Sequence, residues 1–331
     1  MESRQGEVVV ITGASAGVGR ATAQAFARRG AKIGLMARGM KGLEATRDEV
    51  EALGGEALVL PGDIADAGYV ESAAQAVEDR FGPIDIWINN AMTSIFAEFK
   101  DITPEEYRRV TDVTYHGTVY GTMAALKRMR PRDRGSIVLV GSALAYRGIP
   151  LQSAYCGAKH AIQGMFDSVR SELLHAKSNV RISMVHLPAV NTPQFRWVLS
   201  KLPRKAQPVP PIFQPELMAD AIMWAAYNEK REMVVGFPSL KAIVGNKLAP
   251  AFADWYLSQT GYESQMIDEP EDPNRPSNLW EPVDTNPGAH GVFDDRAKSY
   301  SPQVWLNKNK RWVSLAGTGL AAVAAGFMLR R

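Results

Sequence analysis

Near its N-terminus the chain reads Val8-Val9-Val10-Ile11-Thr12-Gly13-Ala14-Ser15-Ala16-Gly17-Val18-Gly19, a β-branched run followed at once by a glycine-rich turn. The run predicts a buried strand, and the turn predicts the start of a helix. Small and apolar residues after the turn keep helical spacing: Val18, Thr22, Ala25 and Phe26. This strand-turn-helix unit decides the fold, because such units repeat in α/β proteins with a parallel sheet.

The glycine-rich turn is also a candidate binding site. Between a strand and a helix, backbone N–H groups and the positive helix end can bind the pyrophosphate of a dinucleotide. Gly13 would permit the tight turn, Gly17 the approach of backbone to phosphate, and Gly19 close packing of helix on strand. The candidate cofactor-binding residues of this turn are Thr12, Gly13, Ser15, Gly17, Val18 and Gly19. The alternative is a glycine-rich turn that arose by chance.

Residues 1–240 continue the alternation of short β-branched runs and amphipathic helical stretches. Candidate strands are 8–11, 32–36, 57–60, 84–88, 136–140, 181–186 and 232–235. We therefore expect an α/β fold in which a doubly wound, seven-stranded parallel sheet carries helices on both faces.

Two further segments of this region have distinct patterns. Thr103-Pro104-Glu105-Glu106 combines an N-cap, a proline at the first helical position and a capping-box glutamate, so a long helix should follow toward Met129. Residues 189–215 are repeatedly interrupted by proline and carry many large apolar side chains. We interpret this segment as an apolar lid, with a solvent-facing linker as the alternative.

The remainder of the chain predicts an extension in two parts. Residues 241–307 are expected to form an extension and linker, with a helical segment over 242–257 and a tether or surface wrapping over 268–287. Residues 308–331 contain eighteen uncharged, mostly apolar residues between basic flanks, which predicts a membrane-anchor helix. A helix packed on the protein or on a dimer partner is the alternative.

Composition excludes some classes of function. The chain has 331 residues and a net charge of only +3, so nucleic acid is not an expected partner. Its single cysteine, Cys156, indicates a reducing compartment, and its five histidines lack metal-ligand spacing, so no metal is expected. The polar N-terminus does not resemble an export signal. We expect a protein facing the cytoplasm, either anchored to a membrane or soluble.

The end of the second predicted strand bears on the choice of cofactor. NAD-binding sheets usually place an acidic residue there, on the ribose 2′-hydroxyl, but the chain has Met36-Ala37-Arg38. Arg38 could instead pair with a 2′-phosphate, and Arg20 could share that task, so NADP(H) is favoured over NAD(H). An ordinary solvated arginine is the alternative.

The strongest chemical signal is Tyr155-Cys156-Gly157-Ala158-Lys159, with Ser142 thirteen positions before the tyrosine. Four residues apart on a helix, Tyr155 and Lys159 share one face. A neighbouring ammonium favours phenolate, which would lower the high pKa of a tyrosine. Ser142, at the end of a predicted strand, could hold the carbonyl or alcohol oxygen of a substrate while hydride moves.

With these motifs in place, residues 6 to 240 resemble the short-chain dehydrogenase/reductase family, whose fold is of the Rossmann type. The glycine-rich turn resembles its cofactor loop, Asn89-Asn90-Ala91 its motif after the fourth strand, and Ser142, Tyr155 and Lys159 its active site. The resemblance implies that Tyr155 is the general acid/base and that Lys159 also binds the nicotinamide ribose. It further implies cofactor contacts for Asp63, Asn90 and Thr192.

The sequence departs from the family pattern at three positions. Thr114 stands where the family usually has an asparagine that helps hold a proton-relay water; its hydroxyl could bind water, so we retain Thr114 as a candidate catalytic residue. Met92 and Ala189 each replace a usual glycine, which could narrow the site.

The resemblance also implies partners. Family members usually pair through the long helices, here 104–129 and 153–175, so a homodimer or homotetramer is expected. We expect a small alcohol or carbonyl substrate, apolar because of the lid and the expected anchor. The leading hypothesis is an NAD(P)-dependent oxidoreductase that moves hydride between NADP(H) and a secondary alcohol or ketone. The alternative is a catalytically weak nucleotide-sensing or membrane-associated scaffold protein that keeps the fold.

Overall fold

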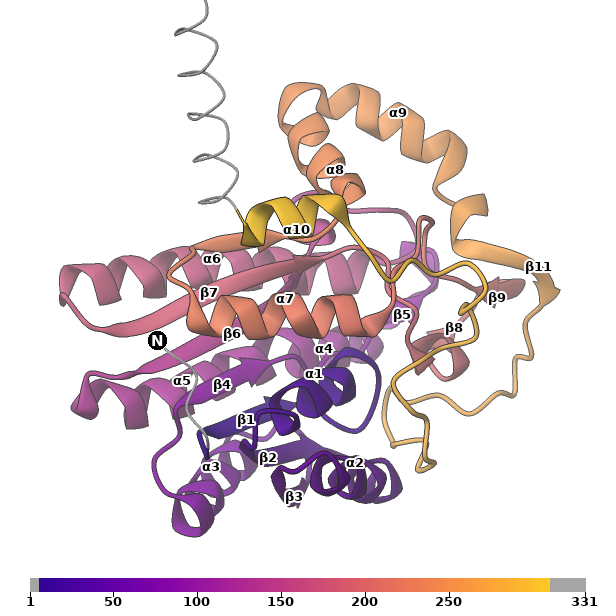
Figure 1. The fold of residues 1–331 in the computed structure, drawn as a ribbon. Helices are drawn as coiled ribbons and strands as arrows, with labels where there is room; N and C mark the ends of the chain where they lie inside the picture. Colours follow the sequence, from indigo (N-terminus) through magenta and orange to yellow (C-terminus); the bar gives the residue numbers. More distant parts are fainter. Residues whose placement is uncertain (1–5, 310–331) are drawn as a thin grey trace, which may run out of the picture.

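The computed structural model describes residues 6–309 and has a central parallel sheet between two layers of helices (Figure 1). Within these residues seven strands form one sheet, in the order β10-β7-β6-β4-β1-β2-β3. Their bounds are β1 Val8–Thr12, β2 Lys32–Ala37, β3 Glu56–Pro61, β4 Ile86–Asn89, β6 Gly135–Ser142, β7 Val180–Leu187 and β10 Glu232–Val234. Every neighbouring pair in this sheet is parallel. The predicted doubly wound, seven-stranded fold is therefore confirmed.

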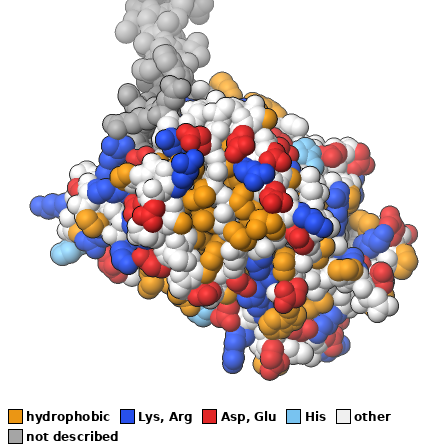
Figure 2. Space-filling view, turned by 90° about the horizontal axis from the view of Figure 1, so that it is seen from below, with side chains coloured by type: hydrophobic (Ala, Val, Ile, Leu, Met, Phe, Trp, Pro, Cys, Tyr) orange, Lys and Arg blue, Asp and Glu red, His pale blue; other side chains and the backbone are white. Residues whose placement is uncertain are grey.

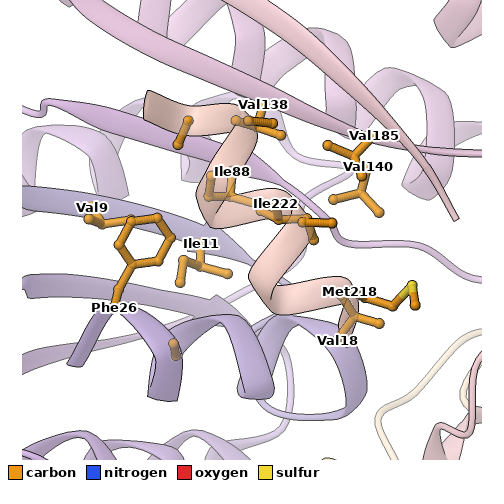
Figure 3. Close-up of a cluster of buried hydrophobic side chains, with 14 of the residues drawn as sticks. Val9, Ile11, Val18, Phe26, Ile88, Val138, Val140, Val185, Met218 and Ile222 are labelled. Atoms are coloured by element: carbon orange, nitrogen blue, oxygen red, sulfur yellow. The ribbon is translucent and has the colours of Figure 1, made fainter. Parts of the chain in front are cut away.

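Helices cover both faces of the sheet, since right-handed crossovers between parallel strands place them there. The bounds are α1 Gly17–Ala27, α2 Met40–Ala52, α3 Ala67–Phe81, α4 Pro104–Thr111, α5 Gly117–Met129, α6 Ser153–His175 and α7 Pro215–Tyr227. One buried cluster joins α1, α2 and α7 to the sheet; Figure 3 shows Phe26 and Ile222 facing strand residues such as Ile11 and Val138. A second cluster, containing Val77, joins α3, α5 and α6 to the other face.

The helix expected over 104–129 is continuous but contains a change of winding. Its N-terminus has the predicted capping box between Thr103 and Glu106. Between α4 and α5, a π-helical segment spans Asp112–His116. Such π-bulges concentrate at functional sites, because they turn side chains away from the regular helical register.

The chain after the sheet folds back over it. The expected boundary at residue 240 falls inside α8, Phe237–Leu248, and a second helix, α9, begins at Pro250 and ends at Thr260. The helix predicted over 242–257 is thus two helices, because proline cannot continue a helix. Beyond it, β11 (Met266–Pro270) pairs with β9 (Arg204–Ala206), and α10 spans Pro302–Lys308. Short strands β5 (Ile95–Phe96) and β8 (Leu199–Ser200) form another pair.

The outer surface carries both signs of charge. On the face shown in Figure 2, acidic and basic side chains are interspersed around a central group of hydrophobic ones. The predicted anchor over 308–331 lies, apart from its first two positions, outside the described residues. Among residues 6–309, none of the helices has the length and apolar character needed to cross a bilayer.

Candidate active site

A cavity of about 1260 Å³ opens at the carboxyl ends of the sheet strands. It lies beside the point where the strand order reverses, since β1 has β4 on one side and β2 on the other. In open α/β sheets, ligands bind in the crevice at this switch point. Residues from β2, β6 and β7 and from the loops after β1 and β4 line the cavity.

The glycine-rich turn forms one wall and is braced from two sides. Gly13 has φ +68°, a left-handed conformation that favours glycine, and its N–H donates to the Met36 carbonyl at 2.7 Å. The amide of Asn90 donates to the carbonyls of Thr12 (3.0 Å) and Gly13 (3.2 Å). Both contacts hold the turn in place.

The N-terminus of α1 faces the cavity, because Ala16, Gly17 and Val18 all line it. Ala16 occupies the N-cap, and its methyl side chain cannot accept a hydrogen bond from the first turn of the helix. The positive end of a helix beside backbone N–H groups fits a pyrophosphate, as the sequence predicts. A pyrophosphate at this helix end would share it with the Gly288 carbonyl, which accepts from the Gly17 N–H at 3.2 Å.

Thr12 and Gly19 support the shape of the glycine-rich turn. The Thr12 hydroxyl accepts hydrogen bonds from the N–H groups of Asn90 (2.9 Å) and Ala91 (3.0 Å), joining the ends of β1 and β4. Within the described chain, both Thr12 and Gly19 lie outside the cavity lining. Their candidate role in cofactor binding is thus indirect, through the shape of the turn.

Ser142, Tyr155 and Lys159 meet at the cavity. Ser142 ends β6, and the loop that follows returns the chain to α6, which carries Tyr155 and Lys159 one turn apart. All three residues line the cavity. The Lys159 ammonium lies 5.6 Å from the centre of the Tyr155 ring and donates to the Val140 carbonyl at 2.7 Å. The convergence predicted from sequence is present.

Burial governs the electrostatics of this group. It raises the pKa of the Tyr155 phenol well above the ordinary value, while a hydrogen bond with the Ser142 hydroxyl acts in the opposite direction. Burial also lowers the pKa of Lys159 to about 8, because a desolvated ammonium is disfavoured. The lowering of the Tyr155 pKa that the sequence predicts from the neighbouring ammonium is therefore not present in this structure, because burial outweighs it.

A polar network lies behind Ser142. His186 on β7 is fully buried, with Nδ1 3.3 Å from the Ser142 carbonyl oxygen and Nε2 3.2 Å from the Glu232 carboxylate. The Tyr146 hydroxyl donates to the same carboxylate at 2.5 Å. Burial would raise the pKa of Glu232, but its bonds to His186 and Tyr146 lower that pKa to about 2. The network ties the end of β6 to β7 and β10.

Thr114 lies in the π-helical segment and is fully buried. Its hydroxyl donates to the Thr93 carbonyl at 2.9 Å and accepts from the Thr93 N–H at 3.1 Å. Among the described residues, Thr114 is outside the cavity lining, whereas its neighbour Val113 is part of it. The hydroxyl that the sequence suggests for a relay water thus connects helix and loop backbone.

The other end of the cavity is closed by a segment that sequence reasoning placed only loosely. Residues 278–288, which we call the C-terminal strap, run back past α2 and α1 (Figure 1). Arg38 donates to the carbonyls of Trp280 (2.7 Å) and Asn278. Asp63 accepts a hydrogen bond from Arg109, whose Nε donates to the Leu279 carbonyl at 2.9 Å. Strap residues lining the cavity are Asn278, Pro282, Val283, Thr285 and Pro287.

The substrate end of the cavity is mostly apolar. Phe195, Trp197 and Val198 come from the segment expected to be a lid, and Met92 and Ala189 stand where the sequence departs from the family pattern. Helices α8 and α9 add Phe237, Leu248, Phe252, Tyr256 and Leu257 to the lining. The lid segment is partly buried rather than solvent-facing, with Val198 2% exposed.

The structure thus gathers most of the predicted site residues and adds others. Predicted residues that line the cavity are Gly13, Ser15, Gly17, Val18, Arg38, Asp63, Asn90, Ser142, Tyr155, Lys159 and Thr192. Sequence reasoning missed the strap and the apolar wall of α8 and α9. The apolar side chains of 237–260 are the signal that could have indicated that wall. The strap contacts the site largely through backbone atoms, which carry no residue-type signal.

Comparisons with known proteins agree with this geometry. The family described as short chain dehydrogenase matches residues 7–201. An uncharacterized oxidoreductase, YxnA of Bacillus subtilis (strain 168), is 33% identical over 323 residues, covering 96% of this chain and 90% of the relative. The human dehydrogenase/reductase SDR family member 7 is 38% identical over 170 residues, 50% of each chain.

A solved structure is similar as well. The short chain dehydrogenase from Mycobacterium paratuberculosis, crystallised bound to NAD, has a TM-score of 0.60 and 27% identity, covering 70% of this chain and 96% of that one. The chain therefore belongs to the short-chain dehydrogenase/reductase family. It is an oxidoreductase that acts on CH–OH groups with a nicotinamide cofactor.

Proposed function

We propose that this enzyme transfers hydride between NADP(H) and an apolar secondary alcohol or ketone, with Tyr155 exchanging the proton. One observation carries the proposal: Ser142, Tyr155 and Lys159 line the same cavity as the glycine-rich turn and an apolar wall. A nicotinamide cofactor supplies or accepts the hydride. The residues of the chain bind the two reactants, orient them and move the proton.

The neutral phenol of Tyr155 suits the direction of reduction. It can give its proton to the carbonyl oxygen of a ketone as that oxygen gains negative charge. The Ser142 hydroxyl, which lines the same cavity as the phenol, can hold the same oxygen. In the reverse direction the phenolate would take the alcohol proton, and a protonated Lys159 would stabilise that phenolate.

The preference for NADP(H) rests on Arg38. It lines the cavity directly after β2, where the 2′ substituent of the adenosine ribose is recognised. The strap carbonyls take only part of its N–H groups, and guanidinium binds phosphate well. Asp63, in the same part of the cavity, supports the proposed contact with adenine.

The choice of an apolar substrate rests on the cavity wall. The aromatic and aliphatic side chains from the 189–215 segment, α8 and α9 would gain favourable contacts from a long or ring-bearing carbonyl compound and few from a small polar one. Each additional buried methylene adds about 0.8 kcal/mol to binding, so kcat/KM should rise with chain length.

One assay tests these points together. The purified full chain is mixed with NADPH or NADH and with ketones and aldehydes of increasing chain length, and loss of cofactor absorbance is followed. We expect faster turnover with NADPH and with the longer ketones. Turnover of small polar carbonyls alone would contradict the apolar substrate, and faster turnover with NADH would contradict the cofactor preference.

We also propose that the chain pairs through its long helices. Met123 on α5 and Leu174 on α6 are 62% and 65% exposed, and a partner would cover these apolar side chains. Light scattering should give the mass of a homodimer or homotetramer, and Met123→Asp with Leu174→Asp should lower it. A wild-type monomer would refute pairing.

The membrane anchor over 308–331 is a separate proposal from the sequence. Fractionation of cells producing the full chain or a chain truncated after Lys308 tests it. We expect only the full chain in the membrane fraction; equal distribution of the two forms would refute the anchor.

A further inference from the structure

The C-terminal strap reaches the end of β2, where dinucleotide-binding sheets distinguish NAD(H) from NADP(H). Asp284 lies on the strap, and its carboxylate accepts the N–H of Lys41 at 2.9 Å, in the first turn of α2. Gly39, at the N-cap of α2, has no side chain with which to cap the helix. A residue more than 240 positions away thus places a negative charge at the positive end of α2, where an anion is stabilised.

This position coincides with the end of β2. Strand β2 ends at Ala37 and α2 begins at Met40, so Asp284 reaches the turn between them. A β-carbon on Gly39 would lie 3.3 Å from a carboxylate oxygen of Asp284. Dinucleotide-binding sheets carry their 2′-reading residue in this turn, either an acid for a hydroxyl or an arginine for a phosphate.

The strap also engages the arginine of this turn. The carbonyl oxygens of Asn278 and Trp280 both accept from the Arg38 guanidinium. A 2′-phosphate would bind the same guanidinium and the same N-terminus of α2. The strap therefore presents to the turn the kind of oxygen atoms that a phosphate would bring.

The geometry points to the C-terminal strap as a second determinant of cofactor choice beside Arg38, with Asp284 as its specificity-determining residue. With Asp284 on α2, the turn accepts the 2′-hydroxyl of NAD(H), while the 2′-phosphate of NADP(H) must bind against the carboxylate or displace it. The Asp284 carboxylate thus lowers the affinity for NADP(H) that Arg38 provides. This inference rests on the nicotinamide cofactor and not on which form the wild-type enzyme prefers.

The strap is held to the rest of the protein on both sides of Asp284. Leu279 is fully buried in a cluster with Ile95 and Val110. Toward the other end, Asn286 accepts from Arg20 at 2.7 Å and the Gly288 carbonyl accepts from the Gly17 N–H at 3.2 Å. Between these points Asp284 is exposed, and its carboxylate reaches α2 through the Lys41 N–H. Asp284 therefore contacts α2 through its side chain, between two points at which the strap is held.

Repulsion gives the direction of the effect. Arg38 lies among charges of both signs, since the cationic Arg109 and the carboxylates of Asp63 and Glu281 all act on it. Asp284 adds one more negative charge beside this group, at the turn that a phosphate dianion would enter. Unit charges of like sign several ångströms apart repel even near a protein surface, and salt screens this repulsion. A neutral ribose 2′-hydroxyl is repelled much less by a carboxylate than a phosphate is.

Direct binding measures the effect without turnover. NADPH and NADH are titrated into the wild-type full chain, Asp284→Asn and Asp284→Ala, and the dissociation constants are read from cofactor fluorescence. Asp284→Asn removes the charge but keeps an oxygen that can cap α2. We expect both variants to bind NADPH about fivefold or more tightly than wild type while NADH changes by less than about twofold, and the gain to shrink in high salt.

A matched control is Asp268→Ala, which removes a fully exposed carboxylate from the same extension. It should leave both dissociation constants unchanged. The inference is overturned if the ratio of the NADPH to the NADH constant is the same in wild type and Asp284→Asn, or if both cofactors weaken together. Tighter NADH than NADPH binding by the wild type would refute the proposed preference but leave this ratio test intact.

Discussion

Gly19 lies so close to Gly13 that a β-carbon on Gly19 would stand 2.1 Å from the Gly13 carbonyl oxygen. No side chain can be accommodated at that distance unless the backbone of the turn moves. The first turn of α1 and the end of β1 are thus packed backbone against backbone. The position of the N–H groups proposed to bind pyrophosphate depends on this contact.

Gly19→Ala should therefore weaken cofactor binding at least tenfold and destabilise the fold by about 1–3 kcal/mol, the usual cost of overpacking. Thermal unfolding and cofactor titration measure the two effects. Gly164→Ala on α6 is the matched control, because among the described residues its added carbon would meet nothing within 4 Å beyond its chain neighbours and the backbone of its own helix. That variant should gain about 0.5–1 kcal/mol. Wild-type cofactor affinity in Gly19→Ala would contradict the packing argument.

Removal of the Tyr155 hydroxyl should separate chemistry from binding. Tyr155→Phe keeps the ring but loses the proton, so kcat should fall by about 10²–10⁴-fold, while the dissociation constant for NADPH should change by less than about threefold. Tyr262→Phe, a partly exposed tyrosine on the extension, serves as the control and should retain full activity. Substantial turnover by Tyr155→Phe would remove this residue from the proton transfer.

Lys159 gives stability a dependence on alkaline pH. Burial lowers its pKa from 10.5 to about 8, so between these values the unfolded chain binds the proton more strongly than the folded one. Stability from this group therefore rises as pH increases from about 8 toward 10.5. The free energy of unfolding of wild type, minus that of Lys159→Met, should increase across this window. A difference that stays flat or falls would contradict this direction of the pH dependence.

Glu232 gives stability a dependence on acid pH. Its bonds to His186 and Tyr146 hold its folded pKa at about 2, below the ordinary 4.5. The stabilisation is present above about pH 4.5 and is lost as pH falls toward 2. Glu232→Gln should destabilise the protein at neutral pH by about 1–3 kcal/mol and lose part of this acid dependence.

Urea unfolding at several pH values provides the measurement. Glu51→Gln, which removes an exposed carboxylate from α2, should keep the acid dependence of wild type. Equal pH profiles for Glu232→Gln and wild type would show that the bonds of Glu232 to His186 and Tyr146 do not cause the acid dependence of the free energy of unfolding.

The sequence predicts the sheet well because its strands are short β-branched runs separated by glycine and proline. All seven expected strands are present, with ends that move by one or two residues. The convergence of Tyr155 and Lys159 follows from the helical repeat alone. Ser142 joins them because β6 ends at the edge of the sheet where α6 begins.

The surroundings of Thr114 and Arg38 depend on contacts with residues distant in the sequence, which the pattern of residue types does not reveal. The hydroxyl of Thr114 could have faced a water or a backbone group, and only the fold places Thr93 beside it. The sequence predicts an Arg38 that is free for phosphate, but backbone carbonyls of distant residues bind it. Carbonyl groups are common to every residue, so the sequence indicates the strap only as surface wrapping.

The strap also affects the order in which the enzyme is made. A ribosome releases the seven strands and the catalytic helix well before residue 288, so a nascent chain can assemble its sheet while the nucleotide end of the cleft still lacks a wall. Cofactor captured during synthesis would meet an open turn in which Arg38 is uncovered. If Asp284 acts as we propose, discrimination between the two nucleotides is complete only after this late-translated part of the fold is in place.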